Sequence, residues 1–211
     1  MIITKIEIQK RNKEKANIHI DGKYAFSLTV NGLLECGLKE GSEISIDDIE
    51  KIRGEDEPSL AVMQALNTIS HSMKTERELR QKLKDKKFSD AAIEHAIQKV
   101  KNYGYIDDSS YVVSYIQSKA MPNGWGEQKI ISMLLKKGID MQLVKDKIAE
   151  CYSEEDMEDN AMNVAKKYYA KLKGEDSRKN KQKLYGHLIS KGFKYDIASS
   201  VCRKLFDDDD Y

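Results

Sequence analysis

Apolar and polar residues follow two different periods along this chain. Near the start they alternate, which is the period of a half-buried strand. The alternation predicts three short strands, over residues 2–8, 16–20 and 23–28. Asp21 and Gly22 join the last two strands, and this dipeptide is typical of a tight hairpin turn. The beginning of the chain is therefore expected to form an antiparallel meander, which is too small to be stable unless it packs on helices.

The same alternation assigns faces to the predicted strands. One side of the first strand should carry Ile2, Thr4, Ile6 and Ile8, and one face of the third should carry Tyr24, Phe26 and Leu28. A helical turn over residues 31–36 and a short helix over residues 46–53 follow, with acidic residues in the first turn of that helix. Residues 54–58 then predict a charged link, which is the expected boundary between the strand unit and the rest of the chain.

From Pro58 onward the apolar residues recur at helical spacing. One pattern occurs three times: two apolar residues four positions apart, followed five positions later by a third. The copies are Leu79, Leu83 and Phe88, then Ile130, Leu134 and Ile139, then Leu184, Leu188 and Phe193. They lie 51 and then 54 residues apart. Self-similarity at a period of this size indicates a tandem array of helical units.

Helix start and stop signals in the sequence divide each unit into three predicted helices. Thr75 and Glu78 form the sequence pattern of a capping box, Ser89 is placed to cap the next helix, and Ser153 to open the third unit. The fold class expected is mostly α: three tandem three-helix repeats in an extended, curved array, preceded by a small antiparallel β unit. The predicted domains are the β unit at 1–54, repeats at 58–106, 107–152 and 153–206, and an acidic tail at 207–211.

Composition restricts the class of protein. The chain of 211 residues has a net charge of +1, and 34% of its residues are charged. The charge is segregated, because residues 161–206 hold twelve Lys or Arg against three Asp or Glu. No apolar stretch of about 18 residues predicts a membrane span, and no signal peptide pattern is seen. Three widely spaced cysteines suit a reducing cytoplasm, where we expect the protein to act.

No pattern of residues predicts catalysis, a metal or a cofactor. The neighbouring Asp107 and Asp108 stand at a helix start, where capping and the helix dipole explain them. The four histidines have no ligand spacing with one another or with a cysteine. A glycine-rich phosphate loop and a nucleophile with a base are also not evident. We therefore expect a binding protein rather than an enzyme.

Basic residues on the second helix of each unit are the candidates for partner binding. The predicted partner-binding or DNA-binding residues are Arg77, Arg80, Lys82, Lys86, Lys87, Trp125, Lys129, Lys136, Lys137, Arg178, Lys179, Lys183 and Lys191. A solvated helix face explains any one lysine equally well, but recurrence at equivalent positions favours function for Lys86, Lys137 and Lys191. Trp125 lies between two glycines and is either an interface anchor or a packing residue.

Two motifs accompany the threefold repeat: the run Tyr103-Gly104-Tyr105-Ile106-Asp107-Asp108 followed by Tyr111, and Gly124-x-Gly126 leading to Lys137-Gly138-Ile139. These features give the chain a resemblance to the RecX family of bacterial RecA regulators. It implies a non-enzymatic protein that lies along the groove of the RecA filament on single-stranded DNA. Such proteins restrain strand exchange, ATP hydrolysis and co-protease activity, and so affect recombinational repair and the SOS response. Some members also bind DNA weakly.

Two other functions remain open from the residues alone. Each three-helix unit could act as a helix-turn-helix module that binds DNA directly. The array could also be a scaffold for another partner. In the leading interpretation the chain acts as a monomer on a RecA–DNA filament, without a membrane partner. A repeating partner suits a tandem array, because several weak contacts on one chain raise the overall affinity.

Overall fold

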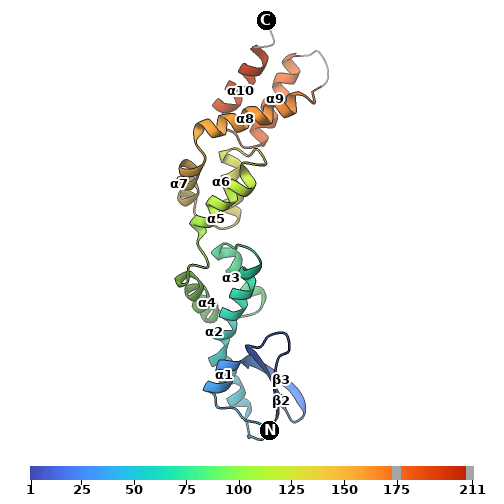
Figure 1. The fold of residues 1–211 in the computed structure, drawn as a ribbon, viewed down its shortest axis with the longest axis vertical. Coiled ribbons are helices and arrows are strands. Elements are labelled where there is room, and N and C mark those ends of the chain that lie inside the picture. The colour runs from blue at the N-terminus through green and yellow to red at the C-terminus, as the bar shows by residue number, and fades with distance from the viewer. Residues whose placement is uncertain (173–176, 208–211) are drawn as a thin grey trace. The chain divides into compact units, whose positions relative to one another are not determined.

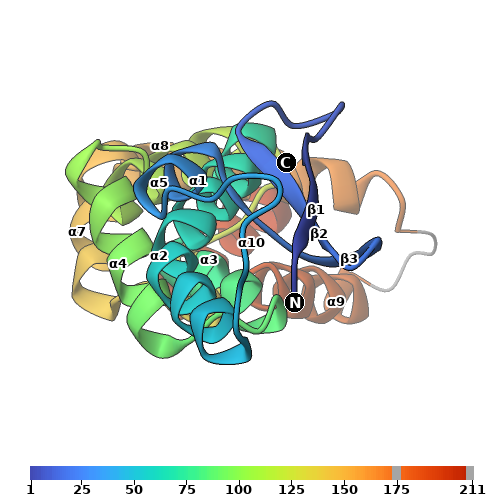
Figure 2. The same ribbon diagram turned by 90° about the horizontal axis from the view of Figure 1, so that it is seen from below.

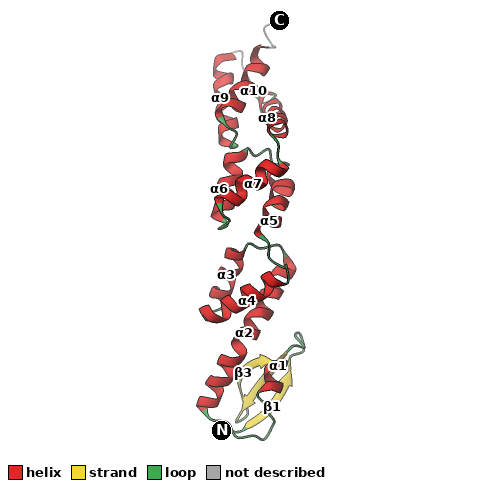
Figure 3. Ribbon diagram, turned by 90° about the vertical axis from the view of Figure 1, so that its left-hand side faces the viewer, coloured by secondary structure: helices red, strands yellow, loops and turns green. Residues whose placement is uncertain are grey.

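The computed structural model describes residues 1–172 and 177–207, and these divide into two compact units between Ile106 and Asp107. Figure 1 shows the helices and strands of both units, and Figure 3 shows that strands occur only near the N-terminus of the described chain. The fold is mostly helical with one small sheet, as predicted. The predicted tail at 207–211 lies outside the described residues, apart from Asp207, where the last helix ends.

Three antiparallel strands form the sheet, in the order β1-β2-β3. The strands are β1 at Ile3–Ile8, β2 at Lys15–Ile20 and β3 at Lys23–Thr29. The positions agree with the prediction to within a residue. Helix α1 (Val30–Glu35) and the first half of α2 (Ile46–His71) pack against this sheet (Figure 2). The helices supply the packing partner that so small a sheet requires.

Two β-bulges change the faces predicted for the strands. The register shifts between Ile3 and Lys5, so Ile3 is fully buried, although the alternation placed it opposite the predicted apolar face. A second shift between Ile18 and His19 leaves Ala25 unpaired on β3. Tyr24 therefore does not share the buried face of Phe26 and Leu28; 60% of its surface is exposed. An extra residue in one strand inverts the faces beyond it, and period-two reasoning cannot detect such a residue.

The charged link predicted at residues 54–58 is wrong, because α2 runs without interruption from Ile46 to His71. Pro58 lies inside the helix, where it removes the hydrogen bond to the carbonyl of Gly54. Gly54 is exposed, so water can satisfy that carbonyl. Ile52 and Ala61 are buried on either side of the proline, and packing on both the sheet and α4 outweighs its local cost.

Asp56, within the predicted link, fastens the sheet to α2. Its side chain is only 3% exposed and accepts hydrogen bonds from the N–H and the hydroxyl of Thr29. Thr29 is also the N-cap of α1, so one buried carboxylate holds the end of β3, the start of α1 and the middle of α2. A buried carboxylate needs such donors, because burial without them is costly.

The rest of the first unit is a three-helix repeat. The second half of α2 packs with α3 (Glu76–Asp85) and α4 (Asp90–Asn102) around a core that includes Leu79, Leu83 and Ile93. The capping box at Thr75 and the N-cap at Ser89 are both formed, as predicted.

The second unit contains two further sets of helices around one core. The first set is α5 (Asp108–Tyr115), which continues into a π-helical turn at Ile116–Ala120, then α6 (Glu127–Lys136) and α7 (Met141–Cys151). The second set is α8 (Glu154–Tyr169), α9 (Ser177–Ser190) and α10 (Tyr195–Asp207). The domain ranges predicted from the sequence remain a prediction.

The recurring sequence pattern corresponds to one structural device, a Schellman cap at the C-terminus of α3, α6 and α9. In the first copy, the Phe88 N–H donates to the Leu83 carbonyl at 3.4 Å, and the Lys87 N–H to the Lys84 carbonyl at 2.8 Å. In the second copy, the Ile139 N–H donates to the Leu134 carbonyl and the Gly138 N–H to the Leu135 carbonyl. In the third copy, the Phe193 N–H donates to the Leu188 carbonyl and the Gly192 N–H to the Ile189 carbonyl. The residue directly before the third apolar residue of the pattern has a positive φ, which is +64° at Lys87, +84° at Gly138 and +88° at Gly192. The third apolar residue of the pattern is thus the hydrophobic partner that this cap requires.

Candidate partner-binding surface

The thirteen predicted partner-binding residues fall into two groups. The exposed group is Arg77, Lys82, Lys86, Lys87, Lys136, Arg178, Lys179 and Lys183. The partly buried group is Arg80, Trp125, Lys129, Lys137 and Lys191. Each group is described within its own unit.

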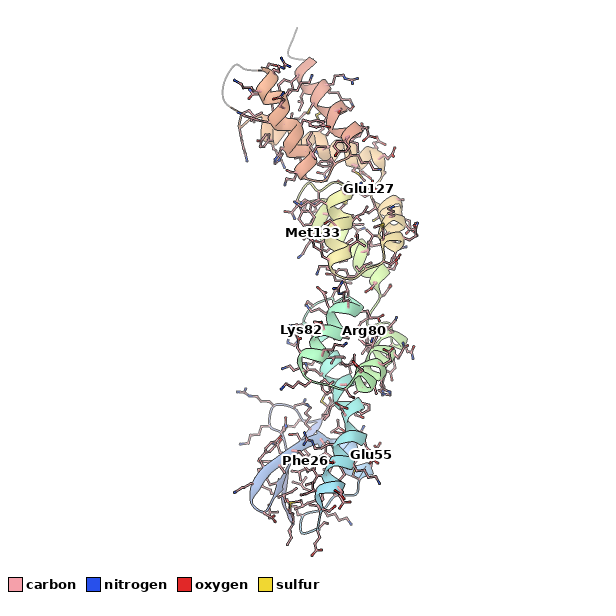
Figure 4. All side chains as sticks on the ribbon, turned by 180° about the vertical axis from the view of Figure 1, so that it is seen from behind. Phe26, Glu55, Arg80, Lys82, Glu127 and Met133 are labelled. Carbon is pink, nitrogen blue, oxygen red and sulfur yellow. The ribbon has the colours of Figure 1, made fainter. Side chains whose placement is uncertain are left out.

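Arg80 has a structural role in the first unit. Its guanidinium contacts Glu76 at 2.8 Å and Glu94 at 2.7 Å, which joins α3 to α4. The bonds from Arg80 and Gln98 lower the pKa of Glu94 to about 2, and Lys101 with Arg80 lowers that of Glu76. Figure 4 shows Arg80 on the side of α3 that faces α4, with Lys82 on the opposite side. Lys82 is therefore the better candidate for contact with a partner.

The three recurring lysines occupy the same position in the three Schellman caps. Lys86, Lys137 and Lys191 each directly precede the residue with positive φ, at the negative end of a helix dipole. A cation is favourable there by roughly 0.3–1 kcal/mol. Their recurrence therefore has a structural explanation as well as the functional one.

In the second unit, two of these lysines also make specific contacts. The Lys137 ammonium lies 5.5 Å from the centre of the Tyr111 ring, and the Lys191 ammonium donates to the Asn123 carbonyl at 3.2 Å. Replacing either lysine would disturb packing as well as charge. In the first unit, Lys86 and Lys87 are exposed.

Those two exposed lysines line a groove of about 680 Å³ in the first unit. Lys15 and Arg53 line it as well, from β2 and α2, and Tyr24 lies on its wall. The one carboxylate in the lining, on Glu57, accepts hydrogen bonds from the N–H and hydroxyl of Ser89. The groove is thus strongly cationic. Sequence reasoning missed Lys15 and Arg53, because it placed the function on the second helix of each repeat.

The two helical sets of the second unit meet through backbone groups. The Gly126 N–H donates to the Lys191 carbonyl at 2.9 Å, and the Gln128 N–H to the Gly192 carbonyl at 3.0 Å. The C-terminus of α9 thereby satisfies donors at the N-terminus of α6, whose N-cap Gly126 has no side chain to do so. A Cβ on Gly126 would lie 2.4 Å from the Gly192 carbonyl oxygen, so only glycine permits this approach.

Trp125 packs beside this junction. It is partly buried against the core of the second unit, with its ring centre 6.2 Å from that of Tyr115. The Lys129 ammonium lies over the Trp125 ring, 5.0 Å from the ring centre. The packing contact is thus present and the ring is partly exposed, while the role of Trp125 as an interface anchor stays a prediction.

His187 of α9 lies in an environment that the sequence did not indicate. Its ring stacks on Tyr168 of α8, with centres 4.0 Å apart and an interplanar angle of 6°. Burial lowers the pKa of His187, and Lys191, Lys171 and Lys129 lower it further. Since the three lysines come from different elements of the unit, only the fold reveals that they surround one histidine.

The acidic pair at the start of α5 has the capping role predicted for it. Asp107 is the N-cap, and its carboxylate accepts from the N–H groups of Ser109 and Ser110. The Ser110 hydroxyl contributes most to lowering the pKa of Asp107. Among the described residues, His, Cys, Asp and Glu form no group of three that could hold a metal ion. None of the described helices has the length and apolar character needed to cross a bilayer.

The arrangement defines a class of protein: three-helix repeats, each with a basic second helix that ends in a Schellman cap, joined to a small sheet. Family models match the chain at residues 1–45 (regulatory protein RecX N-terminal domain), 61–99 (RecX, first three-helix domain) and 154–202 (RecX, third three-helix domain).

Full-length relatives give the same result. The regulatory protein RecX of Clostridium beijerinckii is 36% identical over 213 residues, covering 99% of both chains. That of Clostridioides difficile is 35% identical over 210 residues, covering 100% of this chain and 98% of its own. This chain belongs to the RecX family of regulatory proteins.

Solved structures agree with this assignment. A crystal structure of regulatory protein RecX matches with a TM-score of 0.72 and 28% identity, covering 98% of each chain. The crystal structure of RecX from Lactobacillus salivarius matches with a TM-score of 0.67 and 26% identity, covering 72% of this chain and 97% of its own.

The junction between α6 and α9 predicts that Gly126→Ala destabilises the second unit by about 2 kcal/mol or more, because the methyl group would overlap backbone atoms. Gly186→Ala is the matched control. Gly186 lies within α9 with open space around its Cβ position, so the same change there should stabilise by roughly 0.5–1 kcal/mol. Denaturant unfolding measures both. Equal effects of the two substitutions would contradict the close approach.

The environment of His187 predicts an acid-sensitive second unit. Since the folded-state pKa lies below the ordinary 6.5, the stabilisation is complete above pH 6.5 and is lost as pH falls through the folded value. The melting temperature should therefore drop between pH 7 and pH 5. His187→Phe keeps a ring to stack on Tyr168 and should reduce this drop. An unchanged pH dependence in that variant would assign the acid sensitivity to other groups.

Proposed function

We propose that this protein binds the RecA filament on single-stranded DNA along its groove and modulates it, mostly by inhibition. The affected activities are strand exchange, ATP hydrolysis and co-protease activity, and through them recombinational repair and the SOS response. The observation that carries the proposal is the full-length match to proteins named regulatory protein RecX. We infer that the protein acts by binding rather than by catalysis, as a monomer in the cytoplasm.

The exposed basic residues support this function physically. Arg77 and Lys82 of α3, Lys136 of α6 and Lys183 of α9 project from the second helix of each set. A filament repeats its surface, so several such helices on one chain can engage it together and raise the affinity by effective concentration. The negative charge of bound DNA attracts basic helices, and this attraction weakens with salt.

A second candidate function is direct DNA binding by a helical module. The observation that favours it is the cationic groove of the first unit, where Lys15, Arg53, Lys86 and Lys87 converge. The decisive experiment follows RecA ATP hydrolysis on single-stranded DNA while this protein is titrated in at substoichiometric amounts. Inhibition supports the proposed function. No inhibition together with tight binding to naked duplex supports the DNA-binding module, and no effect in either assay leaves a scaffold for another partner.

The exposed face of α3 provides the corresponding mutational test. Arg77→Glu with Lys82→Glu should raise the concentration for half-maximal inhibition by about tenfold, because four units of charge change where the filament is negative. Both residues are exposed, so stability should change by less than about 1 kcal/mol.

The matched control is Lys10→Glu with Lys39→Glu, which changes the same charge at exposed positions of the strand unit. This control should inhibit nearly as well as the unmodified protein. Equal loss in both pairs would mean that total charge, not the α3 face, determines binding.

A further inference from the structure

Positive groups gather where α6 meets the end of α9 in the second unit. A Cβ built on Gly192 would lie 2.5 Å from that of Lys129, so Lys129 stands directly against the C-terminus of α9. Lys191 is the preceding residue, and His187 lies one turn earlier, since its carbonyl accepts from the Lys191 N–H at 3.0 Å. Two helices of different repeats thus bring three cationic or titratable side chains together.

Two aromatic rings border the same place. Tyr168 of α8 stacks on His187 with ring centres 4.0 Å apart, and Lys171 follows Tyr168 by three residues. On the other side, Lys129 lies 5.0 Å from the ring centre of Trp125. Both rings are partly exposed. We call the residues Trp125, Lys129, Tyr168, Lys171, His187 and Lys191 the α6–α9 patch.

The charge of this patch is not balanced from within. The groups that act on His187 are Lys191 at the end of α9, Lys171 after α8 and Lys129 on α6, and all three are cations. The nearby carboxylate of Glu127 is held by Lys194 at 2.6 Å. A concentration of like charge destabilises the free protein by repulsion, and it attracts an anion.

We infer that the α6–α9 patch is a binding site for single-stranded DNA, which holds backbone phosphates with its cations and stacks bases on Trp125 or Tyr168. Proteins bind single strands by this combination of cationic groups and aromatic faces. A duplex keeps its bases stacked inside, so its base faces cannot meet the rings. The choice of DNA rests on the proposed function, in which the filament contains a single strand.

DNA binding at this patch is expected to be coupled to protonation of His187. Burial, and then repulsion from Lys191, Lys171 and Lys129, disfavour a charged His187 and lower its pKa; a phosphate placed among the three lysines would offset the repulsion. Binding should therefore take up a proton, and the affinity should rise as the pH falls toward 6. An acidic polypeptide would share the phosphate's charge, but it has no base to stack on the rings.

Trp125 is the only tryptophan of the chain, so its fluorescence reports on the patch directly. The full-length protein is titrated with an oligothymidylate of about twelve nucleotides, a length within the usual site size. We expect quenching of Trp125, and affinity that is roughly two- to tenfold higher at pH 6.0 than at pH 7.5. An abasic strand of the same length and a polyglutamate peptide serve as comparison ligands, and both should bind more weakly.

Variants are compared by anisotropy of the labelled oligonucleotide. Lys129→Gln with Lys171→Gln should reduce the slope of log affinity against log salt by about 0.7 for each lysine. His187→Gln should remove the pH dependence. Lys119→Gln with Lys145→Gln removes the same charge from exposed positions elsewhere in the unit and is the control.

Loss of affinity in the patch variant but not in the control supports the site. Equal affinity of the patch variant and the control would overturn it, as would binding of polyglutamate or the abasic strand as tightly as oligothymidylate. Because these titrations contain no recombinase, a failure here leaves the RecA ATPase test of the proposed function unaffected, and the reverse also holds.

Discussion

The Schellman cap at the end of α3, α6 and α9 is the constraint on which the rest of the helical structure depends. Each cap joins a buried leucine to an apolar residue five positions later, and forces the residue between them to a positive φ. The chain can then turn into the last helix of each set. In the third copy, the same turn exposes the carbonyls of Lys191 and Gly192, which satisfy the start of α6 and bind two repeats together.

The cap also explains why basic residues recur beside it. A lysine just before the turn faces the negative end of a helix dipole, so stability alone favours it there. The recurrence of these lysines therefore has a structural cause in addition to the binding role proposed for them. Lys137 contacts the Tyr111 ring and Lys191 the Asn123 carbonyl, whereas Arg77 and Lys82 of α3 are exposed.

Features set by local sequence were predictable, and features set by tertiary contacts were not. The capping box at Thr75 needs only its own neighbours, so the start of α3 followed from the sequence. The segment around the buried Asp56 was predicted as a charged link because the partner of Asp56 lies 27 residues away in the sequence. The bulge at Ala25, next to Tyr24, has no counterpart in the alternation of apolar and polar residues. For the same reason His187 escaped notice, because its lysines come from three separate segments.

The central claim is that the Schellman cap, with its residue at positive φ, stabilises the turn into the last helix of each repeat. Exchanging the residues at the positive-φ positions tests this claim most directly. Lys87 and Gly138 occupy equivalent positions, and both are exposed, so packing does not confound the comparison. Lys87→Gly should stabilise the protein by about 1 kcal/mol and Gly138→Lys should destabilise it by about the same amount, measured by denaturant unfolding. Changes of the same sign, or no change in either, would contradict the account.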